Sequence, residues 1–311
     1  MKFLAKSDLS SWIGALLREG PVVAPTKVDD MVLYKPIEKA EQVFLGAIHP
    51  NLSCKDWFFP LTEAIFDIER KDGEVRLVPA EVEKESVIFG VPPCDARALA
   101  LLDKPLMDEP ADALYAERRA KTALVGMGCI EAGSECFCES MGTGPRDSSN
   151  LDVLLLPVEG GYLVEGVTEK GKALLSKANL TESDLTPPPA PSLTPVPADG
   201  IAEVARKIFD DEYWERLADR CIHCNICAYV CPVCYCFDIR DYHNKDKVER
   251  IRTWESCQSP GFTKIAGGYT PRPSKGARMR QRFCHKLLYF PERYGLLKCT
   301  GCGRCVTACP V

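Results

Sequence analysis

The stretch CIHCNICAYVCPVCYCFD, residues Cys221 to Asp238, places six cysteines within sixteen residues. Its first four are spaced C-x2-C-x2-C-x3-C and are followed by a proline, and the same spacing with its proline returns at Cys299, Cys302, Cys305, Cys309 and Pro310. A hydrophobic core does not need so many thiols at such regular intervals. Three thiolates at this spacing converge on one face of a metal cluster, and a fourth has to come from elsewhere in the chain. Both runs therefore predict metal ligands.

This spacing is the signature of bacterial two-cluster ferredoxins, in which the fourth cysteine of each run ligates the cluster of the other run. The first predicted 4Fe-4S cluster is bound by Cys221, Cys224, Cys227 and Cys309. The second is bound by Cys299, Cys302, Cys305 and Cys231. Zinc also takes four thiolates, but its sites usually show two C-x2-C pairs separated by a long gap. The runs therefore favour iron and sulfide over a zinc-stabilised scaffold.

The rest of the composition is that of an ordinary globular protein. The chain has 311 residues, 46% of them hydrophobic, with 17 cysteines and a net charge of −5. The acidic total argues against nucleic acid as a partner. We find no signal peptide pattern at the N-terminus and no apolar run near the roughly 18 residues that span a bilayer. The sequence thus predicts a cytoplasmic protein without a transmembrane segment, in which cysteines are metal ligands more often than disulfides.

The elements outside the cysteine runs predict two domains. An α/β domain over residues 1–185 is indicated by a helix in SDLSSWIGALLREG, capped by Ser7 or Asp8 and ended by Gly20, and by buried strands in SVIFGV, TALVGM and DVLLLPV. DARALALLD, after the first of these strands, has a helical pattern. Residues 186–200 contain six prolines in 15 positions and predict a linker.

Residues 201–311 show helical periodicity and no strand-like alternation after Cys221. We therefore expect a mostly α-helical two-cluster ferredoxin domain, with 67 residues inserted between Cys231 and Cys299. The insertion carries an apolar stripe, best explained as core packing, at Met279, Phe283, Leu287 and Phe290. It also carries seven cations, whose favoured interpretation is a solvated face, at Arg272, Lys275, Arg278, Arg280, Arg282, Lys286 and Arg293.

Several blocks of the sequence resemble one family. The blocks FGVPPCDARALALLD, CFCESMGTGP, CPVCYCFD, TPRPSK and RQRFCHKLLYFPERYG are similar to the beta-subunit family of cytoplasmic NiFe hydrogenases, or sulfhydrogenases, which includes an iron-sulfur component of anaerobic sulfite reductase. The resemblance implies a non-catalytic electron-transfer subunit that works between two others, one that binds flavin and NAD(P) and one that is the catalytic redox subunit. Family members commonly have small residues where this chain has His223 and Asn225.

Four further cysteines lie in the α/β domain: Cys94, Cys129, Cys136 and Cys138. The resemblance favours them as ligands of a third 4Fe-4S cluster, against the alternative of buried free thiols. Their Gly-rich surroundings lack a complete G-x-G-x-x-G fingerprint, so no flavin or nucleotide is expected on this chain. Cys234, Cys236 and Cys257 remain unassigned, with His223, His243 and His285 as further candidate ligands. Cys54 and Cys284 are interpreted as structural.

Overall fold

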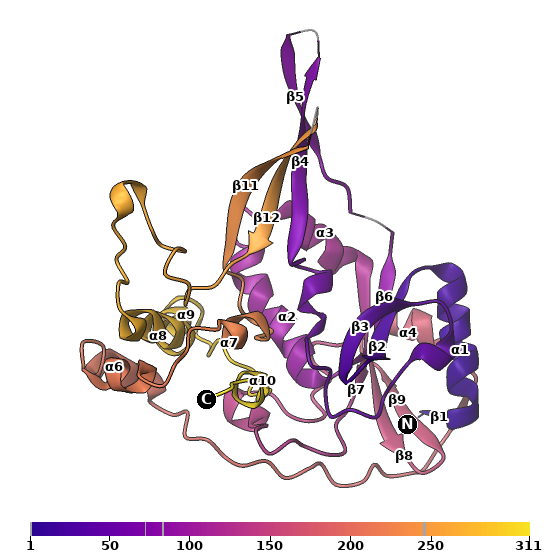
Figure 1. The fold of residues 1–311 in the computed structure, drawn as a ribbon. Coiled ribbons are helices and arrows are strands. Elements are labelled where there is room, and N and C mark those ends of the chain that lie inside the picture. The colour runs from indigo at the N-terminus through magenta and orange to yellow at the C-terminus, as the bar shows by residue number, and fades with distance from the viewer. Residues whose placement is uncertain (1, 72, 83, 245–246) are drawn as a thin grey trace.

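The computed structural model describes residues 2–71, 73–82, 84–244 and 247–311. In this part of the chain, eight strands form a mixed sheet in the order β10-β1-β9-β8-β7-β6-β2-β3 (Figure 1). The strands are β1 (Lys2–Ala5), β2 (Val22–Val28), β3 (Met31–Ile37), β6 (Ser86–Val91), β7 (Thr122–Met127), β8 (Val153–Val158), β9 (Gly161–Gly166) and β10 (Leu180–Glu182). Strands β2, β6, β7 and β8 run parallel, and the outer pairs are antiparallel. The predicted α/β region is confirmed, and its three predicted strands are β6, β7 and β8.

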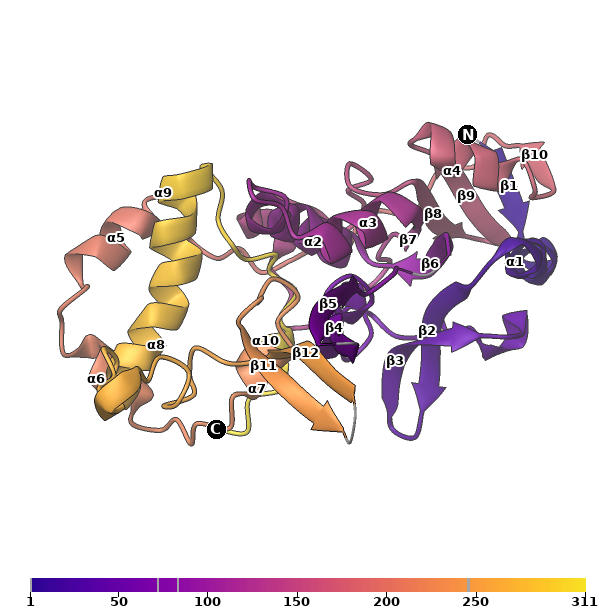
Figure 2. The same ribbon diagram turned by 90° about the horizontal axis from the view of Figure 1, so that it is seen from above.

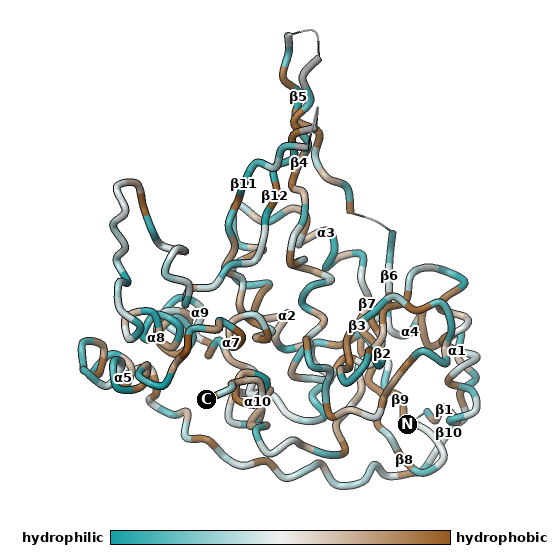
Figure 3. The backbone as a smooth tube through the Cα atoms, viewed as in Figure 1, coloured by the Kyte–Doolittle hydropathy of each residue, from teal (hydrophilic) through white to brown (hydrophobic). Residues whose placement is uncertain are grey.

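Helices cover both faces of this sheet because successive strand residues point to opposite sides. Leu124 and Leu154 pack with α2 (Pro93–Leu106) and α3 (Ala113–Lys121) in one buried cluster. Val125 and Val153 pack on the other face with α1 (Lys6–Glu19) and α4 (Glu169–Leu175). Hydrophobic segments accordingly gather in the central strands (Figure 3).

The predicted first helix is confirmed as α1, and Gly20 ends it by donating its backbone N–H to Leu16. The predicted side-chain cap by Ser7 or Asp8 is wrong. The N-cap is Ala5, and its side chain makes no capping hydrogen bond. Strand β1 runs directly into the helix at this point, so no turn precedes it where a serine or aspartate would cap.

A second sheet joins the two halves of the sequence. It has the order β11-β12-β4-β5, with β4 (Thr62–Lys71), β5 (Glu74–Pro79), β11 (Phe237–Asn244) and β12 (Lys247–Trp254). All its pairs are antiparallel, and in Figure 1 both hairpins rise together from the top of the molecule. The expectation of no strand after Cys221 is therefore wrong, and a mostly α-helical C-terminal region is not confirmed.

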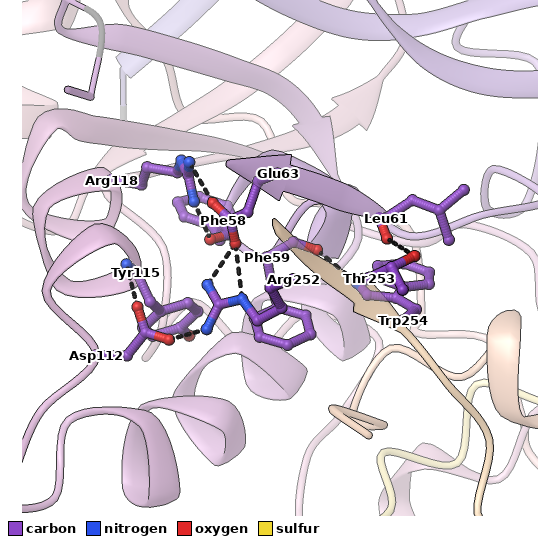
Figure 4. Close-up of polar contacts among 10 residues, drawn as sticks. All are labelled: Phe58, Phe59, Leu61, Glu63, Asp112, Tyr115, Arg118, Arg252, Thr253 and Trp254. Carbon is purple, nitrogen blue, oxygen red and sulfur yellow. Dashed lines mark hydrogen bonds and ion pairs between the residues drawn. The ribbon is translucent and has the colours of Figure 1, made fainter. Parts of the chain in front are cut away.

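A buried ionic network fixes this second sheet to the first domain (Figure 4). Arg252 of β12 is 5% exposed and bridges Glu63 of β4 and Asp112, the N-cap of α3. Arg118 of α3 pairs with the second oxygen of Glu63 at 2.6 Å. The guanidinium of Arg252 also stacks over the ring of Phe59, 4.5 Å from its centroid. Side chains from three elements thus neutralise one another out of water.

The C-terminal helices pack on one side of the sheets, as the view from above shows (Figure 2). They are α5 (Ile201–Lys207), α6 (Tyr213–Ala218), α7 (Ile226–Tyr229), α8 (Lys275–Cys284), α9 (Phe290–Tyr294) and α10 (Arg304–Thr307), with a π turn η5 at His285–Tyr289. Short 3-10 turns complete the assignment: η1 (Ala40–Gln42), η2 (Cys54–Trp57), η3 (Cys138–Met141) and η4 (Ala266–Gly268). Met279 and Phe283 pack against a buried cluster around Trp214 and Leu288, and Phe290 is itself buried. Core packing is confirmed for these three members of the apolar stripe.

The proline-rich segment has no regular secondary structure over residues 183–198 and runs along the lower edge of the molecule from the large sheet to α5 (Figure 1). It is not a free tether, because the backbone N–H of Val196 donates to Ser140 Oγ at 2.8 Å. The boundaries 1–185, 186–200 and 201–311 stay a prediction. Among the described residues, no helix has the length and apolar character needed to cross a membrane.

Candidate metal centres

The first cysteine run forms a loop that leads into the short helix α7. Burial raises the pKa of the Cys227 thiol, and the nearby charges of Cys221, Cys231 and Cys224 raise it further. The backbone N–H of His223 donates to Cys221 Sγ at 3.4 Å. The loop therefore gathers the predicted ligands around its own backbone donors, and it leaves Cys224 exposed.

The second run has the same construction before α10. The backbone N–H of Gly301 donates to Cys299 Sγ at 3.5 Å. Gly301 and Gly303 have φ of 63° and 73°, and His223 and Asn225 at the matching positions of the first run have φ of 58° and 62°. The loop needs left-handed backbone at both positions, which glycine adopts without strain and asparagine tolerates. This requirement gives a physical reason for small residues between the ligands.

The two runs cross at Cys231. Burial raises the pKa of the Cys299, Cys302 and Cys305 thiols, and the charge of Cys231 raises each further, which places Cys231 beside all three. This neighbourhood matches the predicted ligand set of the second cluster. For Cys309 the structure shows an exposed thiol that donates to the Val311 backbone oxygen at 3.5 Å. Its ligation of the first cluster stays a prediction.

The four cysteines of the α/β domain meet in one cavity, which Cys94, Cys129, Cys136 and Cys138 line together with Cys302 of the second run. Cys94 lies in the first turn of α2, Cys129 follows β7, and Cys136 and Cys138 belong to the loop around η3. Burial and the charges of Cys138 and Cys136 raise the pKa of the Cys129 thiol to about 12. The fold thus brings the third predicted ligand set together and places it next to the second cluster.

Two contacts lock this third cavity to the second run. The backbone N–H of Phe137 donates to the Gly301 oxygen at 2.8 Å. Arg304, 2% exposed, makes a bidentate pair with the fully buried Asp95 at 2.5 and 2.8 Å. Asp95 directly follows Cys94, and Arg304 lies inside the second run, so their position beside ligands is the only sequence signal for this pair.

Buried cations surround Cys231. Arg278, Arg282 and Lys286 are 6%, 6% and 9% exposed, so the interpretation of the insertion's cations as a solvated face is wrong for these three. Lys286 Nζ donates to Cys231 Sγ at 3.2 Å. Burial disfavours the charged lysine, but the thiolates of Cys231 and Cys234 outweigh it and raise its pKa above the usual value. Periodicity could not find these contacts, since cations normally face water.

Two more lysines near Cys231 carried no signal in the sequence. Lys55 of η2 is 3% exposed, and its Nζ donates to the backbone oxygens of Cys231 and Cys234 at 3.1 and 3.0 Å. Lys298, 1% exposed, lies over the ring of Tyr235 at 3.6 Å from its centroid. Burial lowers the pKa of Lys55 to about 8 and that of Lys298 to about 7.

These surroundings fit thiolate-bound clusters of net negative charge. A buried cation is stable only when paired or hydrogen-bonded, and the buried Lys55, Arg282, Lys286 and Lys298 form no ion pair with a carboxylate among the described residues. In the described part of the chain, no group of three or more His, Cys, Asp and Glu side chains is arranged to hold a metal ion. Each iron of a 4Fe-4S cube takes one thiolate, so the ligands of a cube stand farther apart than those of one ion.

Comparison with known proteins identifies the class of this region. Residues 220–311 match the family model of the 4Fe-4S dicluster domain, so the C-terminal region is a domain of that class. Over 304 residues the chain is 27% identical to Sulfhydrogenase 2 subunit beta of Pyrococcus furiosus, covering 94% of this chain and 89% of that protein. The resemblance to the sulfhydrogenase beta-subunit family is confirmed by these two findings. No solved structure matches the chain.

Proposed function

We propose that this chain is an iron-sulfur electron-transfer subunit of a multi-subunit oxidoreductase. It passes electrons between two other subunits, one linked to flavin and NAD(P) and one a catalytic redox subunit of the hydrogenase, sulfite or sulfur reductase, or heterodisulfide reductase type. The observation that carries the proposal is the contiguity of the three cysteine groups. Cys302 lines the cavity of the third group, and Cys231 links the first run to the second. The centres therefore follow one another in the order third, second, first.

The proposed ligands are the eight cysteines of the two runs and the four of the α/β domain. When bound, 4Fe-4S clusters supply one-electron oxidation and reduction over a wide range of potentials. The chain's own residues hold the thiolates, bury the third and second groups away from water, and place Arg282 and Lys286 beside Cys234 and Cys231. Positive charge next to a ligand favours the reduced, more negative state of its centre. Cys224 and Cys309 are exposed, so the first centre is the one nearest the surface.

The test begins with the isolated chain purified without oxygen. We expect a brown protein with about eight to twelve irons and as many sulfides per chain, and with EPR signals in the reduced state. A colourless protein that contains zinc and no acid-labile sulfide would overturn the proposal and would instead support a zinc-stabilised scaffold subunit. A single chain that alone reduces sulfite, polysulfide or a disulfide would assign it the catalytic role.

The partners are tested by purification of the native complex. The proposal expects two further subunits to co-purify with this chain, one that contains flavin and one that is catalytic. A large subunit with nickel would identify a hydrogenase complex, whereas a siroheme subunit would identify a sulfite reductase. Isolation of the chain from cytosolic extract without any redox partner would contradict the assignment.

A further inference from the structure

Three cysteines outside the proposed centres meet in one buried cavity. Cys234, Cys236 and Cys257 line it together with Tyr235, Arg282, His285, Lys286 and Lys298. Cys257 is 7% exposed, and the other two are partly buried. The cavity lies beside the second run, because Lys286 Nζ reaches both Cys231 Sγ and the backbone oxygen of Lys298 at 3.2 Å. It is nevertheless lined by none of the twelve proposed ligands.

The hairpin β11-β12 brings these cysteines together across the sequence. Cys236 directly precedes β11, and Cys257 follows β12 by three residues. Phe237 pairs with Trp254 at the base of the hairpin, and the N–H of Glu255 donates to the Cys236 backbone oxygen at 2.9 Å. Antiparallel pairing therefore sets Cys236 and Cys257 side by side, and their side chains are hydrogen-bonded. Cys234 enters from the loop that leaves Cys231.

The charges in this cavity have one sign. Arg282, Lys286 and Lys298 are 6%, 9% and 1% exposed, and no aspartate or glutamate lines the cavity. Arg282 Nη1 donates to Cys234 Sγ at 3.5 Å. Three buried cations facing three thiols need an anionic group to offset their charge, and thiolates bound to a cluster provide it.

We propose that Cys234, Cys236 and Cys257 bind an additional iron-sulfur cluster, separate from the three centres of the proposed function. His285 lines the same cavity and supplies Nε2 as the fourth ligand. This nitrogen is 3.5 Å from both Tyr235 Oη and Lys298 Nζ, so it faces the side of the cavity that holds the polar groups. Histidine replaces cysteine as a ligand in some natural iron-sulfur centres.

The experiment compares the double variant Cys236→Ser, Cys257→Ser with the wild type, both isolated and reconstituted with iron and sulfide without oxygen. We expect the variant to contain about four fewer irons and sulfides per chain than the wild type, because one cluster of four is lost. One component of the reduced EPR spectrum should disappear while the others remain. His285→Ala should change the same component and leave the others unchanged.

Cys284→Ala is the matched control, because Cys284 is fully buried in the apolar cluster around Trp214 and lines no cysteine cavity. It should retain the wild-type iron content and spectrum. Circular dichroism and the remaining EPR components verify that the double variant is folded. As a second measurement, Cys236 and Cys257 should resist iodoacetamide in the loaded protein and react after iron chelation.

Three results would overturn this inference. One is a double variant with wild-type iron content and spectrum. Another is a wild-type mass that shows a Cys236–Cys257 disulfide, and a third is zinc that is lost with these two cysteines. Each leaves the proposed function standing as long as the wild type contains the other clusters. A wild-type chain without iron would instead contradict the proposed function itself.

Discussion

At the scale of single residues, the two cysteine runs share a backbone and differ in what they contact. Both place left-handed residues between the ligands, His223 and Asn225 in the first run and Gly301 and Gly303 in the second. A Cβ at Gly303 would lie 2.5 Å from the backbone oxygen of Glu135, in the loop that carries the third group of cysteines. Glycine is thus required in the second run for packing as well as for backbone angles.

Gly303→Ala and Asn225→Ala separate these two requirements. Both put an alanine at positive φ, which costs about 1 to 2 kcal/mol in each case. Only Gly303→Ala also overlaps Glu135, which adds about 1 to 3 kcal/mol of overpacking. We expect Gly303→Ala to lower the free energy of unfolding more, and to disturb the EPR signal of the third centre. Equal effects of the two variants, measured by anaerobic denaturant unfolding, would contradict close packing of these loops.

The pair Asp95–Arg304 supports the same junction with charge. Asp95→Asn leaves the 2%-exposed guanidinium of Arg304 buried without its counter-ion, so we expect a loss of about 3 to 5 kcal/mol in the free energy of unfolding. Asp108→Asn is the control, because it removes the counter-ion of the exposed Arg293 and should leave stability almost unchanged. If both variants unfold at the same denaturant concentration, the buried pair does not hold the junction.

At the scale of elements, the sequence predicted well what period and burial determine. Strands β6, β7 and β8 are continuous apolar runs in the sheet centre, and α1 has a strong helical period, so each was found. Strands β11 and β12 have the sequences FDIRDYHN and KVERIRTW, in which charged residues dominate. They are held by pairing with β4 and by the ion pairs of Arg252, and neither contact leaves a periodic apolar signal.

Arg252→Met tests whether this ionic network holds the hairpin. The change leaves Asp112 and one side of Glu63 without their buried partner, at a cost of about 3 to 5 kcal/mol. We expect faster amide hydrogen exchange in β11 and β12, and unchanged exchange in β6, β7 and β8. Arg250→Met on the same strand is the control, since Arg250 pairs with Asp241 at the surface and should affect exchange little.

The outcome for Arg252→Lys sharpens the test. Lysine keeps the positive charge but cannot bridge Glu63 and Asp112 with a planar fork, so its exchange rates should lie between those of the wild type and Arg252→Met. Because Cys236 and Cys257 flank the hairpin, the EPR component assigned to the additional cluster should weaken in the same order. Exchange that is equally slow in all three proteins would show that strand pairing alone suffices.

At the scale of the whole molecule, apolar packing and charge pairing stabilise different regions. Two large buried clusters belong to the eight-stranded sheet and its helices, whereas the clusters of the C-terminal region contain few buried residues. The cysteine spacing predicted the two runs and the crossing at Cys231. It could not predict the inward lysines and arginines, because their positions depend on contacts such as that between Lys55 and Cys231, 176 residues apart in the sequence.

Removal of iron should therefore unfold the molecule unequally. Without clusters, Arg282, Lys286 and Lys298 are buried with no anion to offset them, and metal binding contributes directly to folding in such small cores. After anaerobic chelation we expect amides in residues 221–236 and 255–309 to exchange quickly, while β6, β7 and β8 stay protected. Protein handled identically without chelator is the control, and iron with sulfide should restore protection. If apo and loaded proteins exchange alike throughout, the cations are stabilised by the polypeptide alone, and the charge argument for the cysteine sites fails.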